Sequence, residues 1–233
     1  MLKIIITTAA LITQIISATC TTTTTPQDYC DVYLVRHGET NWNAEGKVQG
    51  HTDTPLNKIG EEQALELKEK LKNISFAAIF SSDLMRARQT AEIVRSSDTI
   101  TIVTSPALRE RNMGALEGKS TKDVRQKYYN DGLLHKPHHE MLAYTFDGIE
   151  PYAKVYARVK DFIVSRASKH IGSSILVASH GGVMRSVLYT LAFNHGHSWD
   201  VSNCAIVRLR VHRNGAISLD EHEGVKLIKN AFS

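Results

Sequence analysis

Short apolar runs alternate with amphipathic stretches along the chain, and this alternation predicts strands that are joined by helices. Runs typical of buried strands occupy residues 32–35, 77–80, 100–103 and 174–179. Apolar residues at helical spacing occupy 59–71, 84–94, about 121–129, about 151–167 and 181–193. Two final strands, 203–211 and 216–222, are predicted to pair antiparallel around a turn at Asn214 and Gly215.

Two of the predicted helices carry additional signals. The predicted buried face of the first consists of Ile59, Ala64, Leu67 and Leu71. The helix at about 151–167 begins with Pro151, where the missing amide proton costs little. The stretch before it, with Gly132, Pro137 and Gly148, is expected to be irregular.

Continuous apolar strands that alternate with helices imply a mostly parallel sheet covered on both faces. We therefore predict an α/β fold, a three-layer α/β/α sandwich around a mostly parallel central sheet. Ligands of such sheets bind beyond the carboxyl ends of the strands. Polar stretches begin at these ends, after residues 35, 80, 103 and 178, so four distant segments are expected to meet at one rim.

Residues 1–18 are predicted to be an export signal. Lys3 precedes an apolar stretch, and the small residues Ser17 and Ala18 place cleavage near Ala18. The stretch is shorter than the roughly 20 apolar residues of a membrane span and contains polar positions. We expect a periplasmic, secreted or organellar protein without stable membrane association after signal removal. A retained anchor and a lipoprotein linked through Cys20 are the alternatives.

A threonine-rich linker at 19–30 is predicted to lead into one domain at 31–233. Three cysteines, Cys20, Cys30 and Cys204, match neither a disulfide framework nor a zinc site; whether Cys20 and Cys30 pair stays open, and Cys204 is expected in the core. The net charge of +4 is spread along the chain without a basic, aromatic-rich cluster. A small anionic substrate is therefore expected as the partner, and nucleic acid is not.

The predicted rim collects cations, imidazoles and one carboxylate: Arg36, His37, Asn43, Arg86, Glu110 and His180. Guanidinium groups match phosphate oxygens in bidentate geometry, so the cations predict a pocket for a dianion. Because a carboxylate would weaken anion binding alone, Glu110 suggests proton transfer to a leaving alkoxide. A neutral imidazole can attack phosphorus, so one histidine can be a nucleophile. Arginines can then stabilise the phosphoryl oxygens without a metal.

Five stretches of the sequence resemble the histidine phosphatase superfamily, which contains cofactor-dependent phosphoglycerate mutases and many broad-specificity phosphatases. They are LVRHGETNWN (34–43), QGHTDTPLNKIGEEQA (49–64), SSDLMRARQTA (81–91), LRERNMGALEG (108–118) and SHGGVMR (179–185). The resemblance covers roughly Asp31 to Arg210 and implies a phosphoglycerate mutase-like sandwich. The mechanism expected from these side chains needs no metal, and no cofactor is expected.

For the site, the resemblance implies a phosphohistidine intermediate on His37, with Glu110 as proton donor. The phosphate pocket that it implies consists of Arg36, Arg86 and His180, and Asn43 matches the asparagine that contacts the phosphoryl group in the family. Spacing alone does not choose Arg86 over Arg88 or Glu110 over Glu117. The resemblance decides both choices.

An insertion at about 119–148 is expected to form a short cap that limits substrate size. Its cations Lys122, Arg125 and Lys127 are expected on a solvated helix face, with contacts to a second anionic group as the alternative. Three histidines of the insertion, His135, His138 and His139, lack the companion ligands of a metal site and are expected in a loop. Tyr33 and Trp42 are expected to be packing residues.

The function expected from these features is phosphomonoester hydrolysis. A phosphoglycerate mutase is the alternative, but such enzymes usually carry a longer insertion with two adjacent arginines, and this sequence has no Arg-Arg pair. The opening motif also differs from the RHGxRxP of the family's phytase branch. A non-catalytic phosphate-ester-binding protein is an alternative of another class, although nucleophile and acid are both present.

Overall fold

The computed structural model describes residues 27–132, 138–146, 148–192 and 197–229. Its six-stranded sheet has the order β3-β2-β4-β1-β5-β6. The strands are β1 (Tyr29–Arg36), β2 (Phe76–Ser82), β3 (Ile102–Ser105), β4 (Ser174–Ser179), β5 (His197–His212) and β6 (Ile217–Lys229). The pairings from β3 to β1 are parallel, and those of β5 with β1 and β6 are antiparallel. The predicted mixed but mostly parallel sheet is therefore confirmed.

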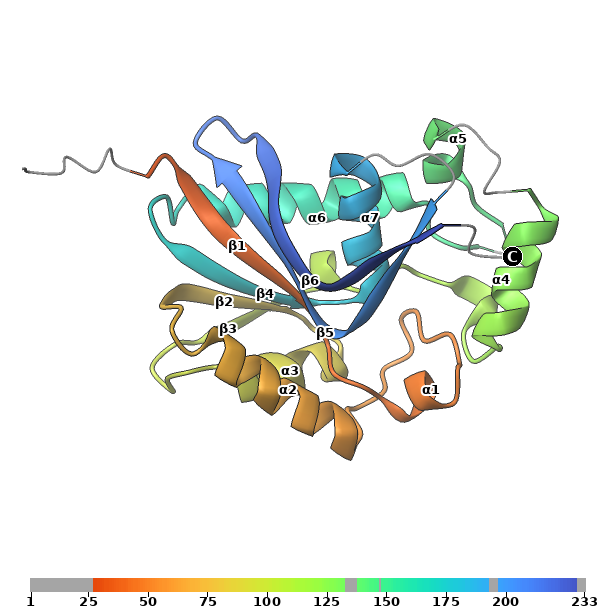
Figure 1. Cartoon of the computed structure of the whole chain (residues 1–233), viewed down its shortest axis with the longest axis horizontal. Helices are drawn as coiled ribbons and strands as arrows, with labels where there is room; N and C mark the ends of the chain where they lie inside the picture. Colours follow the sequence, from red (N-terminus) through yellow and green to blue (C-terminus); the bar gives the residue numbers. More distant parts are fainter. Residues whose placement is uncertain (1–26, 133–137, 147, 193–196, 230–233) are drawn as a thin grey trace, which may run out of the picture.

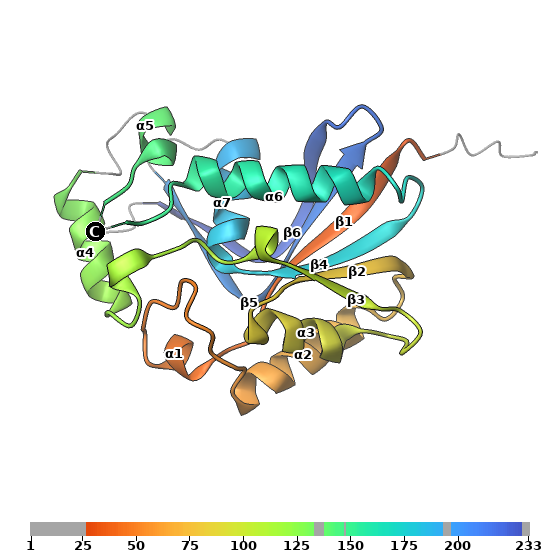
Figure 2. The ribbon, with the colours of Figure 1, turned by 180° about the vertical axis from the view of Figure 1, so that it is seen from behind.

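Helices cover both faces of the sheet (Figure 1). On one face lie α2 (Lys58–Leu71) and α3 (Met85–Val94), and on the other α6 (Tyr152–Ala167) and α7 (Gly181–Leu191), as Figure 2 shows from behind. The short elements are α1 (Asn41–Ala44), η1 (Pro106–Leu108), η2 (Gly114–Leu116), α4 (Thr121–Asn130) and α5 (His138–Ala143). Of these, α1, α4 and α5 lie toward the end of the sheet where β1 finishes (Figure 1).

The core has two parts because successive side chains of a strand point to opposite faces. Val32 and Leu34 of β1 belong to the cluster that includes α6 and α7. Tyr33 and Val35 belong to the cluster that includes α2 and α3. The central strand β1 is thus buried on both faces, as its continuous apolar run predicts.

The buried face of α2 differs from its prediction at one position. Ile59 is 53% exposed, whereas the other three predicted residues are buried. Gly60 takes its place, since it lies one helical turn before Ala64 on the same face. A Cβ on Gly60 would lie 2.1 Å from the carbonyl oxygen of Glu39, so glycine permits this close approach.

The prediction of a buried strand at 100–103 is wrong in detail. The strand runs from Ile102 to Ser105, and Val103 is 44% exposed. Within the described residues β3 pairs only with β2, so it is an edge strand with less cover. The stretch expected to be irregular also contains a helix, α5, and both final strands extend beyond their predicted ends.

The predicted export signal and most of the linker lie outside the described residues, which begin at Gln27. Within the part of the chain that the structure describes, no helix combines the length and apolar character needed to cross a bilayer.

Candidate functional site

Two histidines stand at the ends of neighbouring strands. His37 directly follows β1, and its amide donates to the carbonyl of Ser179 at the end of β4 (3.0 Å). His180 comes next after Ser179 and is the N-cap residue of α7. The two rings are buried, with centroids 5.2 Å apart. Parallel pairing of β1 and β4 therefore joins two distant sequence motifs.

The loop that follows the first histidine is held by both helices beneath it. A Cβ on Gly38 would lie 2.3 Å from the carbonyl oxygen of Gly60, so the loop touches the start of α2. The Gly38 amide donates to Oγ1 of Thr90 on α3 (3.1 Å). The Glu39 amide donates to Oε1 of Gln63 on α2 (2.9 Å). These contacts fix the backbone beside the histidine.

His37 has a defined tautomer. Its Nδ1 lies 2.6 Å from the carbonyl oxygen of Gly38. A carbonyl accepts hydrogen bonds but does not donate them, so Nδ1 carries the ring proton and Nε2 carries the lone pair. Burial and the charges of Arg86 and Arg36 hold the pKa of His37 well below its usual range. His37 is therefore neutral at physiological pH.

Arg86 and Arg36 are cations that bind backbone carbonyls. Fully buried Arg86, on α3, donates through Nη1 to Thr52 (2.9 Å) and through Nη2 to Gly50 (2.8 Å). Arg36 donates through Nη1 to Val201 (2.5 Å). Within the described ranges neither pairs with a carboxylate, and the Nε of each is buried without a hydrogen bond. Burial lowers the pKa of both to about 10, so both stay charged at neutral pH.

The two ring nitrogens of His180 make no hydrogen bond to the described residues. The side chain is fully buried. Burial, followed by the charge of Arg86, holds its pKa well below the usual range. A buried polar group without a partner is costly. A ligand that accepts a hydrogen bond from this ring would offset that cost.

Glu110 brings a carboxylate to the same pocket. It lies between η1 and η2, and its Oε2 accepts from the amide of Gly182 in the first turn of α7 (3.1 Å). Its Oε1 accepts from the amide of Arg111 (2.7 Å). The charge of Glu110 acts on both Arg36 and Arg86. The carboxylate is thus near both guanidinium groups without forming an ion pair with either.

Asn43 lies in α1 beside the first histidine. Its Oδ1 accepts from the amide of Thr40, which caps α1, and from Nδ2 of Asn203 (3.2 and 3.3 Å). Asn203 Nδ2 also donates to the carbonyl of His37 (3.0 Å). The side-chain amide nitrogen is the donor that Asn43 can offer to an anion, since its side-chain oxygen can only accept. All six predicted site residues therefore gather at the end of β1.

Sequence reasoning missed a second guanidinium beside Arg36. A Cβ on Gly181 would lie 3.3 Å from Nη1 of Arg185 and 3.4 Å from Nε of Arg36, so the two side chains are neighbours. Arg185 also donates through Nε to the carbonyl of Trp199 (3.0 Å). Arg185 is the last residue of the motif SHGGVMR, and its place in that motif was the one sequence signal that could have identified it as a site residue.

Glu117 and Asn203 were also missed as supporting residues. Glu117 accepts from the amides of His51 (2.8 Å) and Thr52 (2.9 Å), so it fixes the loop whose carbonyls bind Arg86. Asn203 lies in a bulge of β5, where the pairing with β6 shifts register. No periodicity announces a bulge, so the sequence carried no signal for Asn203.

Among the other candidate features, Cys204 lies beside the site, since its amide donates to the carbonyl of His37 (3.4 Å). Cys30 is buried and Cys204 half-buried, and burial raises the pKa of both thiols to about 12. Cys20 and His135 lie outside the described residues, so whether Cys20 and Cys30 pair stays open. Among the residues that are described, no three His, Cys, Asp or Glu side chains are grouped to hold a metal ion.

Known proteins resemble this chain in sequence and in fold. The chain is 36% identical over 165 residues to Phosphoglycerate mutase-like protein 4 of Arabidopsis thaliana, covering 69% of this chain and 70% of that protein. It is 34% identical over 185 residues to Probable phosphoglycerate mutase GpmB of Escherichia fergusonii, covering 76% and 83%. The solved phosphoglycerate mutase of Bacillus anthracis superposes with a TM-score of 0.73 at 25% identity, covering 84% and 93%. The sequence model of the histidine phosphatase superfamily (branch 1) matches residues 32–221, and the chain belongs to that family.

Proposed function

We propose that this protein hydrolyses small anionic phosphomonoesters through a phosphohistidine intermediate on His37. The observation that carries the proposal is the hydrogen bond from Nδ1 to the Gly38 carbonyl, which leaves the lone pair on Nε2. The charges of two guanidinium groups act on the His37 ring, those of fully buried Arg86 and partly buried Arg36, and neither has a carboxylate partner within the described residues. Such cations favour a dianion, and a neutral imidazole beside it can attack phosphorus.

In the first step, Nε2 of His37 attacks the phosphorus in line, and the bond from phosphorus to the leaving oxygen breaks. Protonated Glu110 gives its proton to that oxygen, so the leaving group departs as a neutral alcohol. The proposed donors to the phosphoryl oxygens are Arg36, Arg86, His180 and Asn43. Their hydrogen bonds stabilise the charge that spreads over these oxygens in the transition state.

In the second step, water attacks the phosphohistidine while the Glu110 carboxylate accepts a proton from the water. The bond between phosphorus and Nε2 breaks, inorganic phosphate leaves, and His37 regains its lone pair. Glu110 ends protonated, ready for the next substrate. The scheme uses only side chains of this protein, so we expect EDTA to leave the rate unchanged; activity lost with EDTA and restored by Mg²⁺ would contradict it.

The test is to trap the intermediate. Purified protein is mixed with a ³²P-labelled phosphomonoester, quenched in alkali, and examined for protein-bound label that is stable to alkali and released by acid. We expect label and turnover in the natural protein and neither in His37→Asn. Turnover that survives in His37→Asn would sink the proposal. Binding of phosphate esters without any hydrolysis would instead support the non-catalytic alternative.

A second candidate is phosphoglycerate mutase activity, which the names of the relatives favour. The neighbouring guanidinium groups of Arg36 and Arg185 offer a place where a second anionic group of a substrate can bind. The protein is given 3-phosphoglycerate with a trace of 2,3-bisphosphoglycerate, and separately a panel of simple phosphomonoesters. Phosphate release from the panel without isomerisation supports the phosphatase, whereas rapid formation of 2-phosphoglycerate with little free phosphate supports the mutase.

A further inference from the structure

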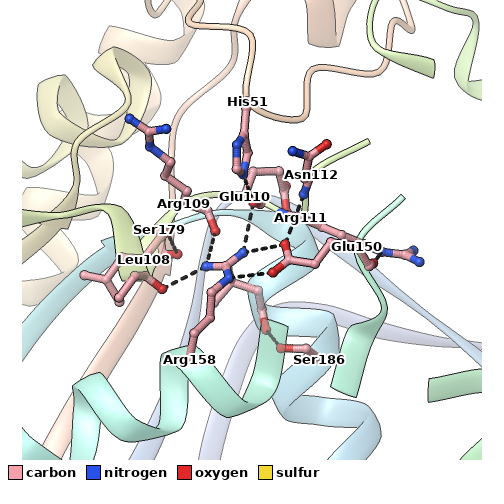
Figure 3. Close-up of polar contacts among 12 residues, drawn as sticks. His51, Leu108, Arg109, Glu110, Arg111, Asn112, Glu150, Arg158, Ser179 and Ser186 are labelled. Atoms are coloured by element: carbon pink, nitrogen blue, oxygen red, sulfur yellow. Dashed lines mark hydrogen bonds and ion pairs between the residues drawn. The ribbon is translucent and has the colours of Figure 1, made fainter. Parts of the chain in front are cut away.

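A two-pronged ion pair lies directly behind Glu110. Arg158, on α6, donates through Nε to Oε1 of Glu150 and through Nη2 to Oε2, both at 2.9 Å. The side chains are only 22% and 11% exposed, respectively. Figure 3 shows the guanidinium of Arg158 between the Glu150 carboxylate and the segment that carries Glu110. Bidentate pairs of this kind have a fixed geometry.

The guanidinium group of Arg158 also donates hydrogen bonds to backbone carbonyls at and before Glu110. Its Nη1 donates to the carbonyls of Ala107 and Arg109, both at 2.8 Å. Its Nη2 donates to the carbonyl of Glu110 itself (3.0 Å). A single Arg158 side chain therefore fixes three carbonyls of four consecutive residues.

Glu150 holds the residues that come after Glu110. The Asn112 amide donates to Oε2 of Glu150 (3.2 Å), and the Glu150 amide donates to the Asn112 carbonyl (2.9 Å). Nε of Arg111 donates to the Glu150 carbonyl. From the opposite side, Nε2 of His51 donates to the Glu110 carbonyl (2.9 Å). The backbone of Glu110 is thus gripped before, at and after its own position.

The pair stays charged while a group at the active site gains and loses a proton. Burial by itself raises the pKa of Glu150, but the hydrogen bonds and charge of Arg158 outweigh it and lower that pKa below its usual value. Glu150 is therefore ionised at neutral pH. The two hydrogen bonds between Glu150 and Arg158 can therefore hold one geometry through the cycle of the proposed proton donor.

We infer that Arg158 and Glu150 are positioning residues that set the place of the Glu110 carboxylate at the leaving oxygen, and that they act on the reaction through Glu110. This inference rests on the proposed function. An acid that is displaced by a fraction of an ångström loses much of its effect, because proton transfer requires hydrogen-bond reach. A group that acts only through the acid should matter most where the leaving group most needs a proton.

The experiment compares an alkyl phosphate, which has a poor leaving group, with 4-nitrophenyl phosphate, which leaves without protonation. The quantity compared is kcat/KM, because it does not include hydrolysis of the phosphohistidine, where Glu110 acts as base for either substrate. Glu110→Gln should lower kcat/KM on the alkyl ester by about 100-fold or more, the usual contribution of a general acid, and on the aryl ester far less. Arg158→Met should show the same preference, with at least about a 10-fold loss on the alkyl ester. The double variant should be no slower than Glu110→Gln alone.

Arg208→Met is the matched control. Arg208 is also 22% exposed and pairs with carboxylates, those of Asp31 and Asp220, but it lies on β5 away from Glu110. We expect it to lower stability while keeping the natural ratio of the two substrate rates. The ratio in Arg158→Met can then be assigned to the position of the acid and not to general loosening.

Equal losses on both substrates in Arg158→Met, or losses that add to those of Glu110→Gln, would overturn the inference. If Arg158→Met does not fold, Glu150→Gln and Arg158→Lys supply the same comparison, with partial rescue expected in the lysine variant. The two proposals fail in different ways. An equal effect of Glu110→Gln on both esters removes the acid role itself, whereas a selective effect there combined with an unselective effect of Arg158→Met removes only the positioning role.

Discussion

Arg86 and Arg158 are both arginines with little exposure that donate to backbone carbonyls, yet among the described residues only Arg158 of the two forms an ion pair with a carboxylate. Arg158 binds Glu150 with two hydrogen bonds and fixes the segment of Glu110. Arg86 binds the carbonyls of Gly50 and Thr52 and has no carboxylate partner among the described residues. The charge of Arg158 is compensated by Glu150, whereas the charge of Arg86 is available to an anionic ligand.

This difference indicates a structural role for Arg158 and a ligand-binding role for Arg86. Removing a charge from water costs several kcal/mol unless a partner compensates it, so an unpaired buried cation is unfavourable for the folded protein alone. The cost is consistent with a site prepared for an anion. A paired cation gives geometry but no net attraction for a ligand. The same substitution should therefore mainly lower stability at Arg158 and mainly lower activity at Arg86.

The largest expected contrast is between Arg86→Met and Arg158→Met. Arg158→Met leaves Glu150 buried without its partner and should lower the free energy of unfolding by about 3 kcal/mol. Arg86→Met should lower kcat/KM by at least about 100-fold, because a transition-state donor is lost. Its free energy of unfolding should change by less than about 1 kcal/mol, since loss of two hydrogen bonds is opposed by relief of burying a charge. Urea denaturation and steady-state kinetics measure both, and equal destabilisation would break the contrast.

The second expectation concerns ligand binding. Inorganic phosphate at 100 times its dissociation constant should raise the free energy of unfolding of the natural protein by about 2.7 kcal/mol. The same phosphate concentration should have almost no effect on Arg86→Met, whereas Arg208→Met should respond like the natural protein. Thermal unfolding with and without phosphate measures this, and an undiminished shift in Arg86→Met would remove Arg86 from the pocket.

The third expectation is a dependence of stability on pH. His37 and His180 have a pKa well below the usual range in the folded chain, so they take up a proton only on unfolding. Stability should therefore be unaffected above about pH 7.5 and fall below about pH 6.5, by up to 1.4 kcal/mol per unit for each histidine. Urea denaturation at pH 7.5 and 5.5 tests this. In His180→Asn the slope should become smaller, and an unchanged slope would show that other groups cause it.

The smallest effect is expected for an exposed ion pair, which serves as the contrast to the buried pair of Arg158 and Glu150. Arg213 pairs with Asp28 at 3.0 Å, but the two side chains are 69% and 70% exposed. Exposed pairs of this kind contribute little because water screens the charges. Arg213→Ala should change the free energy of unfolding by less than about 0.5 kcal/mol and leave kcat unchanged. A change as large as that of Arg158→Met would mean that burial does not decide the value of these pairs.

Much of the fold could be predicted because strong local patterns coincide with the core. The run at 32–35 is buried on both faces and falls within β1. By contrast, α1 has only four residues, Asn41–Ala44, which is too short for any periodicity. Ile59 satisfied the helical pattern, yet a contact between backbones placed Gly60 inside instead. Close approach of two backbones is a tertiary event that a window of sequence does not contain.

The site divides in the same way. Polar residues at strand ends named Arg36, His37 and His180, because the topology of a parallel sheet brings such ends together. Arg158 was only a polar position on a helix in the sequence, since nothing there shows that three carbonyls and a carboxylate converge on it. Supporting residues are defined by where the chain returns in space, and they become visible only with the fold.

The close backbone approach at Gly38 and Gly60 restricts the substitutions that both positions can accept. A Cβ on either residue would meet backbone, at 2.3 Å and 2.1 Å, and backbone cannot swing aside as a side chain can. A replacement at one position is therefore not rescued by a smaller residue at the other, because both are already minimal. A side chain at either glycine would move α2 away from the end of β1, so the two positions share one constraint that is set by the scaffold.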